Sequence, residues 1–224
     1  MNVSDAVRQR RSIRDFRADP VPQELLADIL DTARWAPSGS NIQAWRIIAV
    51  AGAERDAVVQ ITRKAPTSAG FGKTDDPYPI YPPELWEPLR TRRYTLAEDM
   101  YRALGIPRED KPARFQHVAR NFEFFGAPVG LFFVIDRRVV HGQWAHLGML
   151  IQTVALLLEE RGLGSCMQEA WASYRAELAT RFQLAPNEMV YCGMAVGFPK
   201  LENPVNQFER SRITLDELVE FRGF

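Results

Sequence analysis

Two clusters of arginine residues near opposite ends of the chain are the side chains best suited to bind an anion. Arg10, Arg11 and Arg14 surround Ser12 just after a short amphipathic segment, and Arg210 and Arg212 form the second cluster. Guanidinium groups remain charged and present forked donors that match phosphate oxygens. A single basic cluster is usually a solvated face. Two clusters that converge on one ligand would instead form a phosphate site.

A polar turn at residues 36–45 is the second stretch with binding potential, and it contains serines followed by Asn41 and Gln43. Serines in such a turn often do no more than cap the preceding helix. Side-chain amides just before an apolar strand, however, carry both donors and acceptors and can pair with the edge of a heterocycle. A phosphate and a hydrogen-bonding ring together describe a mononucleotide-like cofactor such as FMN, which would itself carry the chemistry.

The sequence lacks the signatures of several other reactions. No GxGxxG follows a predicted strand, and Gly72-Lys73-Thr74 lacks the earlier glycine of a P-loop because Thr67 stands in its place. No HExxH, CxxC or GxSxG motif occurs, so no metal site or serine nucleophile is predicted. The three histidines are scattered and are expected on helix surfaces or hydrogen-bonded in the core: His117, His141 and His146.

The composition is typical of a globular protein, and the formal net charge is zero. The 224 residues include 28 Lys+Arg and 28 Asp+Glu, so binding to nucleic acid or to an anionic membrane is not expected. Cys166 and Cys192 lie in apolar segments and are predicted to be buried thiols rather than a disulfide. The longest apolar run, 147–158, is too short to span a membrane, and the first residues carry no apolar leader segment. A cytoplasmic location is therefore expected.

Hydrophobic periodicity predicts one mixed α/β domain over residues 1–224. Helices are expected at 5–11, with Ser4 as the N-cap, and at 22–35, 54–64, 89–104, 113–125, 145–161, 174–182 and 215–221. Strands are expected at 45–51, 129–135, 165–171 and 190–197, with the first two buried. Six of the fifteen prolines lie between Pro66 and Pro88, so the loop at 65–90 is predicted to be either a functional lid or binding loop or a disordered segment.

In combination, these motifs resemble the FMN-dependent nitroreductase family. The resemblance rests on residues 10–16, 36–45, 162–164 and 193–199, and on Asn206, Arg210, Arg212 and 215–217. It spans nearly the whole chain in the family's order. The family usually has Thr and Pro where this chain has Ile42 and Ala44, and residues 65–115 match only loosely as a variable insert.

The resemblance implies a mixed central sheet flanked by helices, in a domain-swapped homodimer whose C-terminal arms, residues 200–224, wrap the opposite subunit. By the same resemblance, Arg10 and Arg212 would bind the FMN phosphate with help from Arg210. The ribityl chain and ring would contact the rest of the first motif: Arg11, Ser12, Ile13 and Arg14. The remaining cofactor contacts would come from the partner's turn and from a segment facing flavin N5: Pro37, Ser38, Ser40, Asn41, Gln43, Cys166, Met167, Gln168 and Glu169.

The implied reaction is ping-pong hydride transfer, in which NADH or NADPH reduces FMN and a nitroaromatic or quinone-like acceptor then takes the hydride. The acceptor would be small, planar and electron-poor. Aromatic and basic residues of the insert could either select the acceptor or merely pack the insert against the body: Tyr78, Tyr81, Trp86, Arg92, Arg93 and Tyr94. Tyr81, Trp86 and Arg92 are the candidates for substrate contact. Reductive dehalogenation, enone reduction, flavin cleavage and a non-enzymatic flavin sensor remain open alternatives, because one fold supports several reactions.

Overall fold

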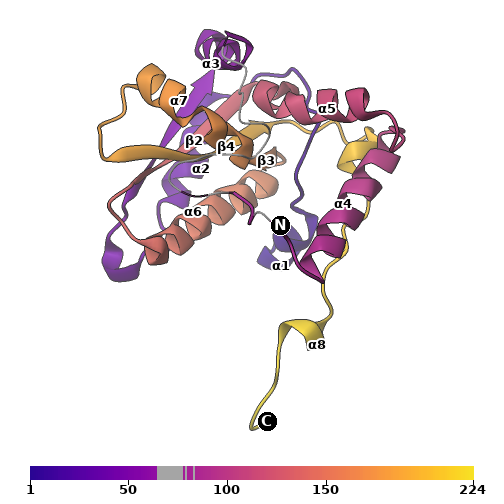
Figure 1. Cartoon of the computed structure of the whole chain (residues 1–224). Coiled ribbons are helices and arrows are strands. Elements are labelled where there is room, and N and C mark those ends of the chain that lie inside the picture. The colour runs from indigo at the N-terminus through magenta and orange to yellow at the C-terminus, as the bar shows by residue number, and fades with distance from the viewer. Residues whose placement is uncertain (65–77, 79, 83) are drawn as a thin grey trace.

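The computed structural model of this chain describes residues 1–64, 78, 80–82 and 84–224. Most of the proline-rich loop predicted at 65–90, including Thr67 and Gly72-Lys73-Thr74, lies outside the described residues. The mixed α/β fold class predicted from the sequence is confirmed (Figure 1).

A four-stranded antiparallel sheet forms the centre of the fold. Its strands are β1 (Trp45–Ala51), β2 (Val129–Asp136), β3 (Gly164–Gln168) and β4 (Glu188–Gly197), in the order β1-β2-β4-β3. The first arginine segment extends the sheet beyond β3 through a parallel bridge between Ser12 and Ser165, where the Ile13 amide donates to the Ser165 carbonyl at 2.9 Å. The arginine cluster is therefore held against the sheet edge.

Helices cover both faces of this sheet (Figure 1). Their bounds are α1 (Val3–Gln9), α2 (Gln23–Ala33), α3 (Gly52–Lys64), α4 (Leu89–Ala103), α5 (Lys111–Ala119), α6 (His141–Glu160), α7 (Arg175–Phe182) and α8 (Leu215–Leu218). Along β2, Leu131, Phe133 and Ile135 pack with α2 and α6, whereas Phe132 and Val134 pack in the core on the other face. This alternation explains why β2 is apolar throughout, as expected for a strand covered on both faces.

Several predicted elements differ from the structure in their extent or burial. β1 has the predicted bounds, but of its residues only Val50 is buried, because β1 is an edge strand of the sheet. The strand predicted at 165–171 ends at Gln168, where the 3-10 segment Glu169–Tyr174 begins. The first helix begins at Val3 because the Asn2 side chain, rather than Ser4, accepts from the Asp5 amide.

The helix predicted at 113–125 is α5 followed by the 3-10 segment Arg120–Gly126. Asp110 caps the Ala113 amide and so starts α5 earlier than expected. Phe124 and Phe125 have φ values of 52° and 53°, in the left-handed region, and both rings are buried in the core. Tertiary packing of these rings therefore outweighs local helix propensity.

The C-terminal residues leave the body of the molecule as an extended arm, drawn in yellow in Figure 1. α8 lies within this arm and is started by a capping box between Thr214 and Glu217, and it is shorter than the helix predicted at 215–221. Phe221 and Phe224 are exposed beyond it. Among the described helices, none has the length and apolar character needed to cross a bilayer.

Candidate active site

The two arginine clusters, 200 residues apart in sequence, meet in one cavity of about 110 Å³. We call this cavity the arginine pocket. It is lined by Arg10, Arg11, Ser12, Arg14, Leu96, Val205, Asn206, Phe208, Arg210 and Arg212. Ile13 lies within the same segment, but its side chain is buried in the core. All five predicted arginines and Ser12 thus surround one space.

The buried side chain of Asn206 joins the two ends of the chain at this pocket. Its Oδ1 accepts from the Arg14 amide at 2.8 Å, and its Nδ2 donates to the carbonyls of Asp15 and Lys200, both at 2.8 Å. The Arg11 guanidinium donates to the Asn206 carbonyl at 2.7 Å. Asn206 therefore fixes the backbone from which Arg11 and Arg14 project.

The arginine pocket has an excess of positive charge. Burial, followed by the charge of Arg212, lowers the pKa of Arg10. Burial, together with the charges of Arg11, Arg10 and Arg212, lowers the pKa of Arg210 to about 10. Within the described part of the chain, none of the five arginines forms an ion pair with a carboxylate. A dianion such as a phosphate would supply the missing negative charge.

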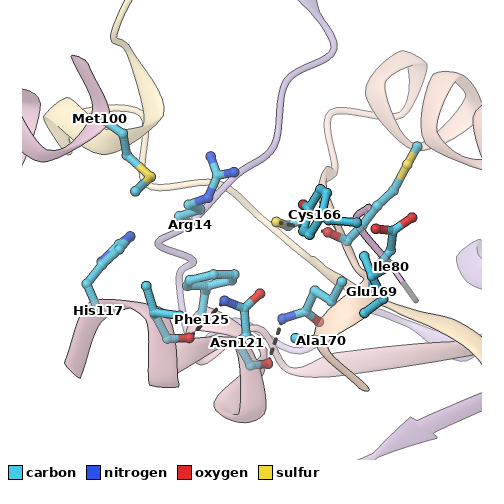
Figure 2. A pocket seen from close by; sticks show the side chains of 13 residues that line it. Arg14, Ile80, Met100, His117, Asn121, Phe125, Cys166, Glu169 and Ala170 are labelled. Atoms are coloured by element: carbon cyan, nitrogen blue, oxygen red, sulfur yellow. Dashed lines mark hydrogen bonds between the residues drawn. The ribbon is translucent and has the colours of Figure 1, made fainter. Parts of the chain in front are cut away.

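A larger cavity of about 340 Å³ shares Arg14 with the arginine pocket. We call it the main cavity. It is lined by Arg14, Ile80, Tyr81, Met100, His117, Val118, Asn121, Phe125, Cys166, Met167, Gln168, Glu169 and Ala170. Figure 2 shows Arg14, Met100 and His117 on one side and Cys166, Glu169 and Ile80 on the other. A cavity of this size whose walls combine apolar side chains with polar and charged ones can hold a planar ligand and fix its orientation.

Gln168 and Asn121 hold one wall of the main cavity in place. The buried Gln168 side chain donates from Nε2 to the Asn121 carbonyl at 2.6 Å and accepts from the Trp171 indole at 3.4 Å. The Asn121 side chain donates from Nδ2 to the Val118 carbonyl at 2.8 Å. These bonds connect the end of β3 to the 3-10 segment that follows α5, and so fix the positions of the residues that both elements present to the cavity.

Cys166 lies in the same wall as a packed thiol. Burial raises its pKa, and burial likewise raises that of Cys192. Both cysteines are free and buried, which confirms the prediction from their apolar surroundings. A thiol with a raised pKa carries little thiolate, so Cys166 shapes the wall rather than acting as a nucleophile.

His117 differs from the hydrogen-bonded core histidine expected from the sequence. It is 6% exposed, and its Nε2 is buried without a hydrogen-bond partner among the described residues. Burial and the charges of Arg120 and Arg14 lower its pKa to about 4, so the ring is neutral near pH 7. The other two histidines agree better with expectation, since His141 is exposed and His146 Nδ1 pairs with Gln143 at 3.1 Å.

The polar turn lines neither cavity of its own chain. The Gln43 amide donates to Ser38 Oγ at 2.9 Å, and the Gln43 side chain donates to the Asn41 carbonyl at 2.9 Å. Ser40, Asn41 and Gln43 have φ values of 52°, 55° and 50°. Within one chain the structure therefore does not bring this turn, with Pro37, to the arginine pocket. Left-handed conformations at three residues with side chains are typical of functional sites.

Of the three residues expected to contact substrate, the structure brings only Tyr81 to the main cavity. The Arg93 guanidinium lies 4.4 Å from the centre of the Tyr81 ring. Trp86 is 63% exposed and lies outside both cavities. Arg92 also lies outside them and pairs with Glu217 of the arm at 3.0 Å.

Sequence reasoning did not identify several residues of the site. Asn206 belongs to one of the motifs that carry the family resemblance. Most of its hydrogen-bond partners are distant in sequence, so no local pattern indicated its role. His117 and Asn121 are four residues apart, a spacing that places two side chains on one face of a helix. That spacing was the available clue to their common position on the cavity wall.

Comparison with known proteins places this site in a family. The model of the nitroreductase family matches residues 7–198. The nitrobenzene nitroreductase of Ectopseudomonas oleovorans is 36% identical over 219 residues, covering 98% of this chain and 96% of the relative.

Solved structures give the same result. The FMN and NADPH-dependent nitroreductase NfnB from Sphigopyxis sp. strain HMH is 39% identical, with a TM-score of 0.94 and 100% of both chains covered. The FMN-dependent NfnB from Mycobacterium smegmatis, in complex with NADPH, is 25% identical, with a TM-score of 0.89 and 98% and 97% of the two chains covered. From the motifs, the fold and these similarities together, we conclude that the chain belongs to the nitroreductase family.

Proposed function

We propose that this protein is an FMN-dependent oxidoreductase that uses NADH or NADPH to reduce nitroaromatic or quinone-like acceptors. The observation that carries the proposal is the sharing of Arg14 between a cationic pocket of phosphate size and a cavity large enough for a planar ring. The names of the similar proteins, which include a nitrobenzene nitroreductase and two FMN-dependent nitroreductases, support the same activity.

The residues of the arginine pocket fit a flavin mononucleotide. Arg10, Arg210 and Arg212 would hold the phosphate, whose charge offsets the mutual repulsion that lowers the pKa of Arg10 and Arg210. Arg11 and Ser12 would contact the ribityl chain, and Arg14 would lie beside the ring where the two cavities meet. Bound FMN supplies the redox chemistry by accepting a hydride from the nicotinamide and passing it to the acceptor in a separate half-reaction.

The walls of the main cavity would orient the ring and the molecules that exchange on it. The segment formed by Cys166, Met167, Gln168 and Glu169 would face the reactive part of the ring. Arg14 would stabilise negative charge on the reduced ring because it is a fixed cation beside the ring edge. Tyr81 offers an aromatic face for a small, planar, electron-poor acceptor.

We propose further that the active unit is a homodimer. The polar turn with Pro37, Ser38, Ser40, Asn41 and Gln43 lies apart from its own chain's cavities and would complete the partner's site. Phe221 and Phe224 of the arm are exposed with ring centres 5.7 Å apart, and a second copy would cover this apolar patch (Figure 1).

The proposal extends to the domain organisation of the chain and to its cellular location. Residues 1–224 would form a single domain in which residues 65–115 are a variable insert that selects the acceptor and residues 200–224 are the dimer arm. The location would be cytoplasmic, in keeping with the two free, buried cysteines.

The test is the visible absorption spectrum of the purified protein, loaded with FMN, before and after anaerobic addition of NADPH or NADH. We expect one FMN per chain, bleaching by at least one nucleotide, and return of the colour when nitrobenzene or a benzoquinone is added. Arg10→Ala should lose most of its FMN, whereas Arg137→Ala, a surface arginine outside both cavities, should retain it. Failure to bind FMN, or flavin colour that persists with both nucleotides, would overturn the proposal.

A further inference from the structure

We propose that His117 contacts the cofactor and that its Nε2 forms a hydrogen bond with the pyrimidine edge of the bound flavin, beside Arg14. This inference rests on the proposed function, because it assigns a ring edge to one end of the main cavity. His117 Nε2 is a buried polar atom without a hydrogen-bond partner among the described residues. Buried polar atoms are rarely left unpaired, and such exceptions often mark the place of a ligand.

The ring of His117 is held in a set orientation on the wall of the main cavity. Its edge packs against Tyr101, with ring centres 6.2 Å apart and planes at 77°, and Phe125 lies 5.9 Å away on a second side. Both neighbours are aromatic and buried, so they limit rotation of the imidazole. Figure 2 shows the His117 ring extending alongside the cavity in the direction of Met100 and Arg14.

The side chains that flank the imidazole at this end can move without a change in the backbone. Met100 and Arg14 are both unbranched and line the same cavity. His117 itself lines this cavity, so a ligand bound there would lie against the imidazole. The shielding of Nε2 from water is therefore compatible with a hydrogen bond to a bound molecule.

The position of Arg14 indicates which part of the cofactor lies near His117. Because Arg14 lines both cavities, its end of the main cavity is the end closest to the phosphate-binding arginines. The ribityl chain must pass here, and the ring atoms next to its attachment on the polar side belong to the pyrimidine edge. That edge alternates hydrogen-bond acceptors with one N–H donor, so either neutral tautomer of His117 can pair with it.

A neutral imidazole complements Arg14 rather than duplicating it. The charges of Arg120 and Arg14, added to burial, keep His117 unprotonated near pH 7. His117 can thus supply a directional hydrogen bond without adding a second positive charge beside Arg14. The same edge of the flavin would meet one cationic and one neutral partner.

The experiment compares FMN binding to the full-length wild-type protein, His117→Phe, His117→Leu and His117→Gln, with FMN removed and then titrated back. His141→Phe serves as a matched control because His141 is exposed and lies outside both cavities. The readouts are the dissociation constant for FMN, the visible absorption spectrum of the bound flavin, and the Tm of the apo-protein.

We expect His117→Phe and His117→Leu to weaken FMN binding about tenfold and to shift the flavin spectrum, as loss of one hydrogen bond would. His117→Gln should stay within about threefold of wild type, and the control should be unchanged. The Tm of apo His117→Phe should not fall, because an unpaired polar atom is replaced by an apolar one. A residue with only a structural role would instead lower Tm and leave the spectrum unchanged.

Two failures can be told apart. If wild type binds FMN and both apolar variants bind it within twofold with an unchanged spectrum, the assignment of His117 is wrong while the proposed function stands. If wild type itself does not bind FMN, the proposed function fails, and the assignment of His117 fails with it.

Discussion

At the scale of single residues, the site depends on two side chains with opposite hydrogen bonding. Asn206 makes three side-chain hydrogen bonds to backbone groups of Arg14, Asp15 and Lys200. His117 leaves a buried Nε2 without a described partner. The first arrangement builds the arginine pocket from two distant segments, and the second marks the main cavity as a place for a ligand.

Replacement of Asn206 by leucine should destabilise the fold and weaken cofactor binding together. The substitution keeps a similar volume but leaves the Arg14 amide and two carbonyls unpaired, at a cost of about 2–4 kcal/mol in the free energy of unfolding. Urea unfolding and FMN titration would measure both effects. Gln207→Leu, at the exposed neighbouring position, should change stability by less than about 0.5 kcal/mol. Equal stability of the two variants would refute the role given to Asn206.

His117 should make stability depend on pH in a defined window. Its pKa is about 4 in the folded chain against an ordinary value of 6.5, so below pH 6.5 the unfolded chain binds more protons. The free energy of unfolding should therefore fall as the pH is lowered from 6.5 towards 4. Urea unfolding at several pH values should show a smaller slope for His117→Phe than for wild type. Parallel curves would contradict a neutral, buried His117 in the native state.

At the scale of elements, the close fit of β3 against the first arginine segment sets the shape of the site. A Cβ added to Gly164 would lie 2.6 Å from Ile13 Cγ1, so only glycine allows this approach. The bridge between Ser12 and Ser165 lies in the same contact. The fit explains why a glycine is required just before the strand that forms the wall of the main cavity.

Gly164→Ala should push the arginine segment away from the sheet and cost about 1–3 kcal/mol, because a buried methyl group has no room there. FMN affinity should fall with stability, since Arg14 is displaced relative to both cavities. Gly142→Ala is the matched control, as nothing lies within 4 Å of its added Cβ and it occupies the first turn of α6. Chemical unfolding together with FMN titration of both variants would decide, and a Gly164→Ala protein with wild-type stability and affinity would refute the argument.

At the scale of the whole molecule, the two ends of the chain are brought together at the arginine pocket, after which the arm departs from the body (Figure 1). The arm is anchored by Arg210, whose guanidinium donates to the carbonyls of Arg10 and Arg8, and by the pair of Arg92 with Glu217. Beyond these contacts its phenylalanines are exposed. In the proposed homodimer, a second copy would bury them.

The double variant Phe221→Asp with Phe224→Asp should weaken the proposed dimer at least tenfold, because burial of one such side chain contributes about 1.5–3 kcal/mol. Sedimentation over a range of protein concentrations would measure the dissociation constant. Glu220→Gln, a control within the same arm, should leave it unchanged. A wild-type protein that remains monomeric at high concentration would refute the dimer, whereas equal association of both variants would refute only the role of the arm.

The amino-acid sequence by itself determined the features that depend on neighbouring residues. Apolar runs and alternation placed β1 and β2 within a residue of their observed bounds, and the arginine clusters indicated an anionic ligand. These patterns are readable because helix and strand periodicity, caps and charge act over a few residues.

Only the tertiary structure decided which of these residues meet. Three features depend on sheet order and on packing between distant segments: the convergence of Arg10 with Arg210, the side-chain hydrogen bonds of Asn206, and a buried His117 Nε2 that has no partner among the described residues. The structure also leaves the exposed Trp86 and Arg92 outside the main cavity and ends β3 and α5 earlier than their local patterns predicted. Local propensity amounts to fractions of a kcal/mol per residue, so burial of large side chains such as Phe124 and Phe125 overrides it.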